Sequence, residues 1–322
     1  MREGLLLRAE SEGGRVGYGE VAPIRGFGRE TVDVDETLLQ ALGDTVDAAW
    51  LERVPAEWGA LRQALGTAMG TTLAGAGRRE HLPVAALLPA GLEALKRIEP
   101  LAEAGFRTFK WKVGVGDAAD EMAMLDDLLA RMPQGGKLRL DANGAWDRRM
   151  AERWLARCAD YPIEHVEQPI AAEDRKATDL LLGLAGDYPT AIALDESLVG
   201  SGDLDRWLGV GWPGVYVVKP SLFDDPTSAL ARLQSARARV VFSSALETAV
   251  GAQHALRIAF SWVGESEGHG DAAAGAGRVR ALGFGVWPLF ADARFDGPAL
   301  APFVRRQDVE RIDPELIWNA LN

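Results

Sequence analysis

The sequence of 322 residues predicts an α/β fold, a (β/α)8-type barrel (a modified TIM barrel) that follows a small α+β capping domain. Eight short apolar runs alternate with amphipathic helical segments from residue 82 onward. Five consecutive runs end in a charged residue, at intervals of 24 to 29 residues. We expect a capping domain at 1–80, a barrel at 81–286, and a C-terminal segment at 287–322 that packs back on the capping domain.

The first 80 residues show a different pattern from the rest. Residues 4–9 and 15–22 predict an antiparallel hairpin around Glu12-Gly13-Gly14, and residues 33–54 and 57–77 carry apolar positions at helical spacing. Between them, residues 24–31 place two glycines around Phe27. This composition suits a mobile, ligand-covering loop and an ordinary turn equally well.

The apolar runs have the near-continuous hydrophobic character of parallel strands that are covered by helices. The last unit is irregular, because residues 261–277 are rich in glycine and alanine, and we predict a long loop with a degenerate helix there. The eight predicted strands are 83–88, 108–113, 138–140, 163–166, 192–194, 215–218, 240–242 and, less clearly, 282–286.

Composition excludes several classes of protein. A formal net charge of −12 argues against nucleic acid or an anionic membrane surface as a partner, and no apolar run approaches the ~18 residues of a membrane span. Cys158 is the single cysteine and is interpreted as an inert core residue. With no secretory leader pattern at the start, we expect a cytoplasmic protein. The sequence makes no prediction of the oligomeric state.

The charged residues that end successive runs are the strongest functional signal. They are Lys112, Asp141, Glu167, Asp195 and Lys219. Because each interval is one β/α unit, all five side chains should meet at the carboxyl-terminal mouth of the barrel, where such barrels place their chemistry.

Three of these residues are carboxylates on adjacent strands, and they would repel one another unless a cation neutralised them. Oxygen ligands suit a hard divalent cation, so Asp141, Glu167 and Asp195 predict an Mg²⁺ site. Lys112 and Lys219 would flank this site on opposite sides of the mouth. The arrangement suits abstraction of a proton α to a carboxylate. A set of salt bridges without a metal is the alternative.

The sequence Lys110-Trp111-Lys112 places both lysines on one face of a strand. Two neighbouring ammonium groups disfavour the second charge, which is useful where a neutral amine is needed as a base. An exposed edge strand would show the same pattern. The nearby metal site favours the catalytic interpretation.

The motifs together resemble the enolase superfamily, and within it the o-succinylbenzoate synthase family is the closest match. The resemblance rests on the two lysines, Val-Lys-Pro-Ser at 218–221 and motifs outside the barrel strands at 22–31 and 242–248. The carboxylate motifs are Leu-Asp-Ala-Asn-Gly-Ala-Trp at 140–146, Val-Glu-Gln-Pro at 166–169 and Asp-Glu-Ser at 195–197.

The resemblance implies a role for each residue in a syn dehydration of a cyclohexadiene carboxylate to 2-succinylbenzoate, in menaquinone and phylloquinone biosynthesis. Lys112 would be the general base, Lys219 would stabilise the intermediate, and Lys110 would lower the pKa of Lys112. Substrate oxygens would contact Asn143, Ser243 and Ser244, while Arg139 would support Asp141 or the substrate. Ordinary strand-end hydrogen bonds are equally compatible with the last four residues.

Two other functions are compatible with this sequence. A dipeptide epimerase or N-acylamino acid racemase of the same superfamily would employ both lysines as alternating bases. A non-catalytic binding barrel is the remote alternative. In either enzyme the partner is a small-molecule carboxylate.

Overall fold

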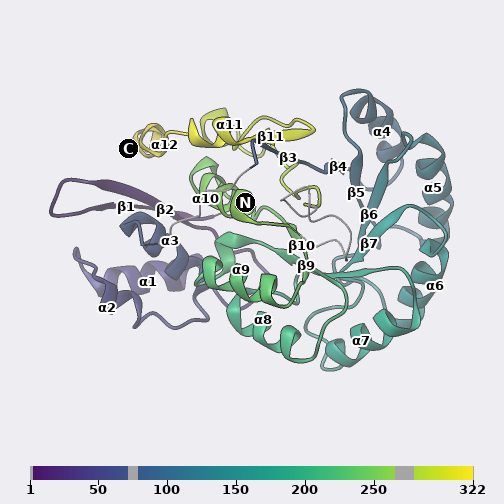
Figure 1. Ribbon diagram of the computed structural model, residues 1–322, viewed down its shortest axis with the longest axis horizontal. Coiled ribbons are helices and arrows are strands. Elements are labelled where there is room, and N and C mark those ends of the chain that lie inside the picture. Colours follow the sequence, from purple (N-terminus) through teal and green to yellow (C-terminus); the bar gives the residue numbers. More distant parts are fainter. Residues whose placement is uncertain (1–2, 72–78, 265–278, 322) are drawn as a thin grey trace.

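The computed structural model describes residues 3–71, 79–264 and 279–321 (Figure 1). A curled, all-parallel sheet of seven strands carries helices on its outer side, and the N-terminal hairpin lies to one side with three helices. This confirms the predicted barrel with an α+β cap. Most of the loop predicted at 261–277 lies outside the described residues.

The N-terminal unit is an antiparallel hairpin packed on a helix. Gly17 and Gly19 in β2 permit this packing, because a Cβ on either would lie 2.1 or 2.0 Å from a backbone oxygen of α3. The helix predicted at 33–54 is divided, since Gly43 ends α1 with a φ of +73°. The elements are β1 Leu5–Glu10, β2 Val16–Val21, α1 Val32–Leu42, α2 Ala48–Leu51 and α3 Gly59–Met69.

The barrel sheet runs in the order β10-β9-β8-β7-β6-β5-β4, with every neighbouring pair parallel. Its strands are β4 Ala86–Leu88, β5 Thr108–Lys112, β6 Lys137–Asp141, β7 Ile163–Glu167, β8 Ile192–Leu194, β9 Val215–Val218 and β10 Arg239–Phe242. The covering helices are α4 Glu93–Glu103, α5 Ala118–Arg131, α6 Arg148–Cys158, α7 Ala177–Asp187, α8 Gly200–Gly209, α9 Pro226–Ser235 and α10 Ala249–Ser261.

The eighth predicted strand, 282–286, is not a regular strand. Leu282 and Gly283 instead form isolated parallel bridges to Val84 and Ser243, so they join the two edges of the sheet. The glycines allow very close approach, because a Cβ on Gly285 would lie 2.2 Å from a backbone oxygen of Ala85. The barrel therefore closes through bridges and not through a full ladder.

The first predicted strand, 83–88, is also interrupted. It divides into β3 His81–Pro83 and β4, and β3 pairs antiparallel with β11 Phe303–Arg305 from the C-terminal segment. The remaining elements are the 3-10 helices η1 Pro220–Leu222 and η2 Ala293–Phe295, with α11 Arg306–Glu310 and α12 Pro314–Leu321. Ile317 of α12 belongs to a cluster that includes Leu6 and Tyr18 of the hairpin.

Side chains alternate between the two faces of the barrel strands. Phe109 and Trp111 are fully buried against the helices, and a small inner cluster contains Val215, Val217 and Val241. Along each strand, the charged residue at the end lies an even number of positions from the inward-facing residues, as Lys219 does from Val217. The charged side chains therefore also point into the barrel. Helix packing outside and small apolar residues inside thus fix the direction of the polar side chains at the mouth.

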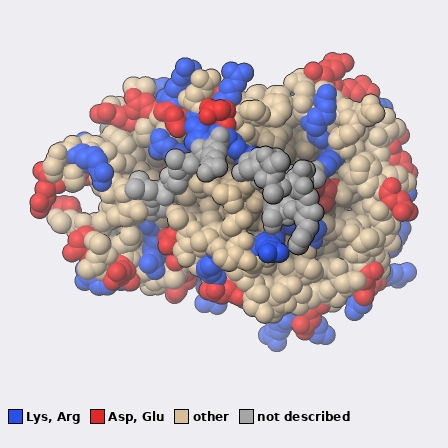
Figure 2. All heavy atoms as spheres, viewed as in Figure 1, with Lys and Arg blue, Asp and Glu red and all other residues tan. Residues whose placement is uncertain are grey.

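None of the helices in the described part of the chain combines the length and apolar composition needed to cross a lipid bilayer. On the face shown in Figure 2, acidic and basic side chains are interspersed.

Candidate active site

The pairing register brings the predicted residues to one end of the barrel. Lys112 of β5 pairs with Asp141 of β6, and Asp141 pairs with Glu167 of β7. Asp195 and Lys219 directly follow β8 and β9. A cavity of about 300 Å³ opens at this end. Its polar lining consists of Lys110, Lys112, Asp141, Asn143, Asp195, Lys219, Ser243 and Ser244.

Lys110 lies between two of the predicted metal ligands. Its Nζ is 2.8 Å from Asp141 Oδ2 and 2.6 Å from Glu167 Oε1. Burial lowers the pKa of Lys110, but these two carboxylates outweigh burial and raise it above its usual range. Lys110 is therefore a fixed ammonium group, while the more exposed Lys112 faces the same cavity.

Lys219 occupies the opposite side of the cavity and is almost completely buried. Burial lowers its pKa to about 7, although Glu167 and Asp141 favour the charged form. Its ammonium group forms an ion pair with Asp195 and lies 4.5 Å from the centre of the Phe27 ring. The loop at 24–31 therefore reaches over the mouth of the barrel.

Among the described residues, no three Asp, Glu, His or Cys side chains are gathered closely enough to hold a metal ion as they stand. The reason is local, since lysine ammonium groups lie against the three carboxylates. Asp141 and Glu167 nevertheless converge on one cation, the Lys110 ammonium, which stands in for a metal. An all-oxygen donor set of this kind fits a hard divalent cation.

Asn143 lines the cavity directly beyond β6. Its backbone N–H donates to Asp141 Oδ1 at 3.2 Å, and its side-chain amide donates to Glu196 Oε1 at 2.9 Å. Its φ of +43° is unusual for a residue other than glycine. Burial raises the pKa of Glu196, whose other oxygen has no hydrogen-bond partner in the part of the chain that the structure describes.

The two predicted serines differ in their hydrogen bonds. Ser243 Oγ donates to the Gly283 carbonyl at 3.2 Å, a long contact that a substrate oxygen could replace. Ser244 Oγ accepts from Leu246 N at 2.8 Å and lies 2.7 Å from Glu247 Oε2. Ser244 is therefore already engaged on two sides.

Arg139 lies deeper in the barrel and does not line the cavity. Its Nε donates to Glu164 Oε2 at 2.7 Å, and this guanidinium, together with His165 and Arg280, outweighs burial and lowers the pKa of Glu164 to about 2. Burial lowers the pKa of the neighbouring His165, whose ring nitrogens have no hydrogen-bond partner among the described residues and lie no closer than 3.7 Å to Glu167 Oε2. The structure thus favours support of the strands by Arg139 over contact with a substrate.

Gln168 is a residue that the sequence analysis missed. Its side-chain amide donates to Ser197 Oγ and Ile170 O, while its carbonyl accepts from the N–H groups of Asp195 and Ser197. These bonds join the end of β7 to the turn that carries Asp195. The Val-Glu-Gln-Pro motif contained this residue, but only the structure shows its partners.

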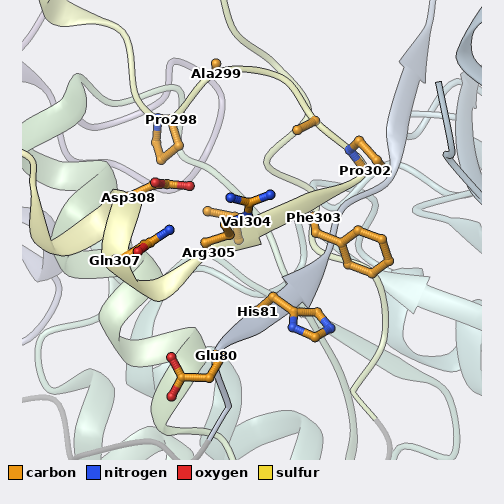
Figure 3. A pocket seen from close by; sticks show the side chains of 11 residues that line it. Glu80, His81, Pro298, Ala299, Pro302, Phe303, Val304, Arg305, Gln307 and Asp308 are labelled. Carbon is orange, nitrogen blue, oxygen red and sulfur yellow. The ribbon is translucent and has the colours of Figure 1, made fainter.

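A second cavity, of about 780 Å³, is larger than the one at the mouth (Figure 3). Residues of β3, β11 and α11 line it, including His81, Arg305 and Asp308, together with Glu80, which directly precedes β3. Because β3 comes directly before β4, the first strand of the barrel sheet, this cavity lies at the amino-terminal end of the barrel. It contains none of the residues predicted to act in catalysis, so the smaller cavity is the candidate active site.

Comparisons with known proteins identify the family of this fold. A family model described as "Enolase C-terminal domain-like" matches residues 93–271. The o-succinylbenzoate synthase of Thermosynechococcus vestitus (strain NIES-2133 / IAM M-273 / BP-1) is 42% identical over 266 residues, which are 81% of this chain and 82% of that protein. A hydrophobic dipeptide epimerase of Roseobacter litoralis is 29% identical and matches 60% of this chain and 61% of its own length.

A solved structure is similar over nearly the whole chain. It is o-succinylbenzoate synthase from Thermosynechococcus elongatus BP-1, complexed with Mg in the active site, and it aligns with 99% of this chain and 92% of that chain. The TM-score is 0.77 and the sequence identity is 36%. This chain belongs to the enolase superfamily. Within that superfamily it is a member of the o-succinylbenzoate synthase family, as the motifs predicted.

Proposed function

We propose that this protein is a hydro-lyase that converts 2-succinyl-6-hydroxy-2,4-cyclohexadiene-1-carboxylate to 2-succinylbenzoate by a syn elimination of water. The observation that carries the proposal is the pair Lys112 and Lys219, which line one cavity and come from β5 and from the end of β9, with three strands of the sheet between them. Membership of the o-succinylbenzoate synthase family selects this reaction among those that such a pair could perform.

The side chains support a one-base mechanism. The amine of Lys112 takes the proton α to the substrate carboxylate, and the electron pair of that C–H bond forms the new double bond. As the C–O bond breaks, Lys112 returns the proton to the departing hydroxyl, which leaves as water. The ring becomes aromatic, which favours the products.

Lys219 and Lys110 have separate roles in this mechanism. The Lys219 ammonium faces the cavity from the far side and stabilises the negative charge that develops when the proton is removed. Lys110, held by Asp141 and Glu167, stays positively charged and is fixed on the carboxylate side of the mouth.

Asp141, Glu167 and Asp195 would hold Mg²⁺, which fits their oxygen-only donor set. When bound, Mg²⁺ would supply positive charge beside the carboxylate oxygens of the substrate. Lys110 and Lys219 would then give up part of their contact with these carboxylates. The metal named for the solved relative supports this assignment.

The test is formation of 2-succinylbenzoate, followed by absorbance, with purified protein before and after chelation of divalent cations. We expect activity with Mg²⁺, loss on chelation and recovery when Mg²⁺ is restored. Absence of product under all conditions would refute the proposal. Racemisation of N-acylamino acids or dipeptides would show that Lys112 and Lys219 act as alternating bases instead.

The sequence-based assignment to menaquinone or phylloquinone biosynthesis follows from this reaction and remains part of the proposal, as does a cytoplasmic location. We also propose the division at 1–80, 81–286 and 287–322. The contact of α12 with hairpin residues Leu6 and Tyr18 supports a C-terminal segment that returns to the cap. The pairing of β11 with β3 ties the same segment to the barrel.

A further inference from the structure

Two glutamates from distant parts of the chain meet beneath Ser244. Glu20 comes from β2 of the hairpin, and Glu247 follows β10 at the mouth of the barrel. A Cβ on Gly251 would lie 2.9 Å from both Glu20 Oε2 and Glu247 Cβ, so the two side chains share the space above this glycine. Both are buried, and Glu247 is completely inaccessible to solvent.

The hydrogen bonds of Glu20 with Thr248 and Gly251 all run toward its carboxyl oxygens. It accepts hydrogen bonds from the backbone N–H groups of Thr248 and Gly251, at 2.8 and 2.9 Å, and from the hydroxyl of Thr248 at 2.5 Å. Backbone N–H groups can only donate, and they belong to the N-terminal turn of α10, where negative charge is favoured. This position therefore favours negative charge on Glu20.

The side-chain partners of Glu247 are hydroxyl groups, which donate or accept as needed. Ser244 Oγ lies 2.7 Å from Oε2, and Ser221 Oγ lies 3.3 Å from Oε1. Heavy-atom positions leave the direction of the hydrogen between two oxygens open. Burial, the largest influence, raises the pKa of Glu247, and the nearby Glu20 raises it further. Hydrogen bonds from Ser244 and from the backbone of Glu247 and Ala245 lower this pKa, but the net shift is upward.

The position of one hydrogen decides what Ser244 can do. If Glu247 is ionised, the single Ser244 hydrogen points to Oε2, and Leu246 N–H occupies a lone pair, so Ser244 has no hydrogen for a substrate. If Glu247 is protonated, Oε2–H donates to Ser244. The hydrogen of Ser244 is then directed into the cavity, which receives an anionic substrate in the proposed function.

We propose that Glu247 is a positioning residue that carries a proton, and that it turns Ser244 into a hydrogen-bond donor for a carboxylate oxygen of the substrate. The reading of Ser244 as a substrate donor rests on the proposed function, whereas the protonation of Glu247 does not. The titratable side chains that face Glu247 are Lys219, which directly follows β9, and Glu20 from β2 of the cap.

Infrared difference spectroscopy tests the proton directly and needs no activity. The spectrum of the wild-type protein minus that of Glu247→Gln should contain the carbonyl band of a protonated carboxylic acid. Loss of an ionised carboxylate band instead would overturn the proposal. Glu99→Gln, at an exposed position of α4, is the matched control and should lose only an ionised band.

Kinetics test the donor. Ser244→Ala should raise KM about tenfold or more with little change in kcat, because a hydrogen bond to a charged group is lost. Glu247→Leu should raise KM similarly, and Glu247→Gln should rescue most of that loss, since its amide can donate to Ser244 as the acid does. An unchanged KM in Ser244→Ala, or Glu247→Gln as impaired as Glu247→Leu, would overturn the proposal.

Two further measurements separate the possible failures. The double variant with Ser244→Ala and Glu247→Leu should be no worse than either single variant, because both act through one hydroxyl, and additive losses would contradict the proposal. If Glu247→Leu does not fold, the KM of Ser244→Ala and the infrared spectrum of Glu247→Gln still test the proposal. If the wild-type protein forms no 2-succinylbenzoate, the proposed function fails, while the infrared result still decides whether Glu247 is protonated.

Discussion

Lys110 Nζ lies 2.6 Å from Glu167 Oε1, although β5 and β7 are separated in the sheet by β6. The same ammonium group contacts Asp141 on the intervening strand at 2.8 Å. Lys110 is therefore committed to the carboxylate side of the mouth. Its neighbour on the same face, Lys112, has no ion pair among the described residues and lines the cavity, so the two lysines have different roles.

Replacement of Lys112 by alanine should reduce dehydration by about 10²-fold to 10⁴-fold, because the side chain serves as both base and acid. Mg²⁺ binding, measured by calorimetry, should stay nearly unchanged, since the three carboxylates remain. Lys96→Ala on the exposed face of α4 is the control and should keep full activity. Near-normal turnover in Lys112→Ala would show that another group takes the proton.

The contact between Phe27 and Lys219 predicts an effect of the loop on substrate binding. Phe27→Leu keeps an apolar side chain but removes the aromatic face that lies 4.5 Å from the ammonium group. We expect a severalfold higher KM and a smaller change in kcat in steady-state assays. Val34→Leu, at an exposed position of α1, should change neither constant. Equal behaviour of the two variants would mean that the ring does not cover the site.

The loop joins the cap near a buried pair of carboxyl groups, Glu30 and Asp35. Burial, and then Glu30, raises the pKa of Asp35 from 3.8 to about 8. The folded protein keeps a proton that the unfolded chain releases, so the free energy of unfolding falls as pH rises from about 4 to about 8, and this contribution is constant above that range.

Asp35→Asn removes this titration and should make the decline with pH shallower in urea unfolding. Asp33→Asn, which lies on the exposed side of the same helical turn, should keep the wild-type slope. The same decline in Asp35→Asn as in the wild-type protein would show that Asp35 is ionised in the folded state.

Closure of the barrel predicts a cost for a small substitution. Gly285→Ala places a methyl group 2.2 Å from the carbonyl oxygen of Ala85, which is backbone and cannot swing away. We expect a loss of stability of about 1–3 kcal/mol in chemical denaturation, as for overpacked cores. Gly183→Ala in α7 is the control, since its Cβ would meet no other atom within 4 Å, and it should be neutral or stabilising. Wild-type stability of Gly285→Ala would contradict the close approach.

The barrel could be predicted from the sequence because each strand and each helix has its own local pattern of apolar residues, and these patterns repeat along the chain. The prediction failed at 282–286 and at 83–88, where pairing depends on residues far away in the chain. Val84 N donates to Pro302 O, and Leu282 bridges to Val84, so these segments bind through contacts that no local pattern records. Gly283 and Gly285 already indicated an irregular strand, since glycine inside a strand often marks close approach of another backbone.

The spacing of Lys112, Asp141, Glu167, Asp195 and Lys219 determined by itself that these side chains belong to one end of a barrel, because each interval is one repeat of the fold. Only the tertiary structure decided how the charges pair, since Lys110 with Glu167 and Lys219 with Asp195 depend on the curvature of the sheet. The same holds for Glu20, which contacts Thr248 from 228 residues away. The position of a residue along its strand determines which face of the sheet and which end of the barrel its side chain occupies. Packing between distant segments determines which residue that side chain contacts.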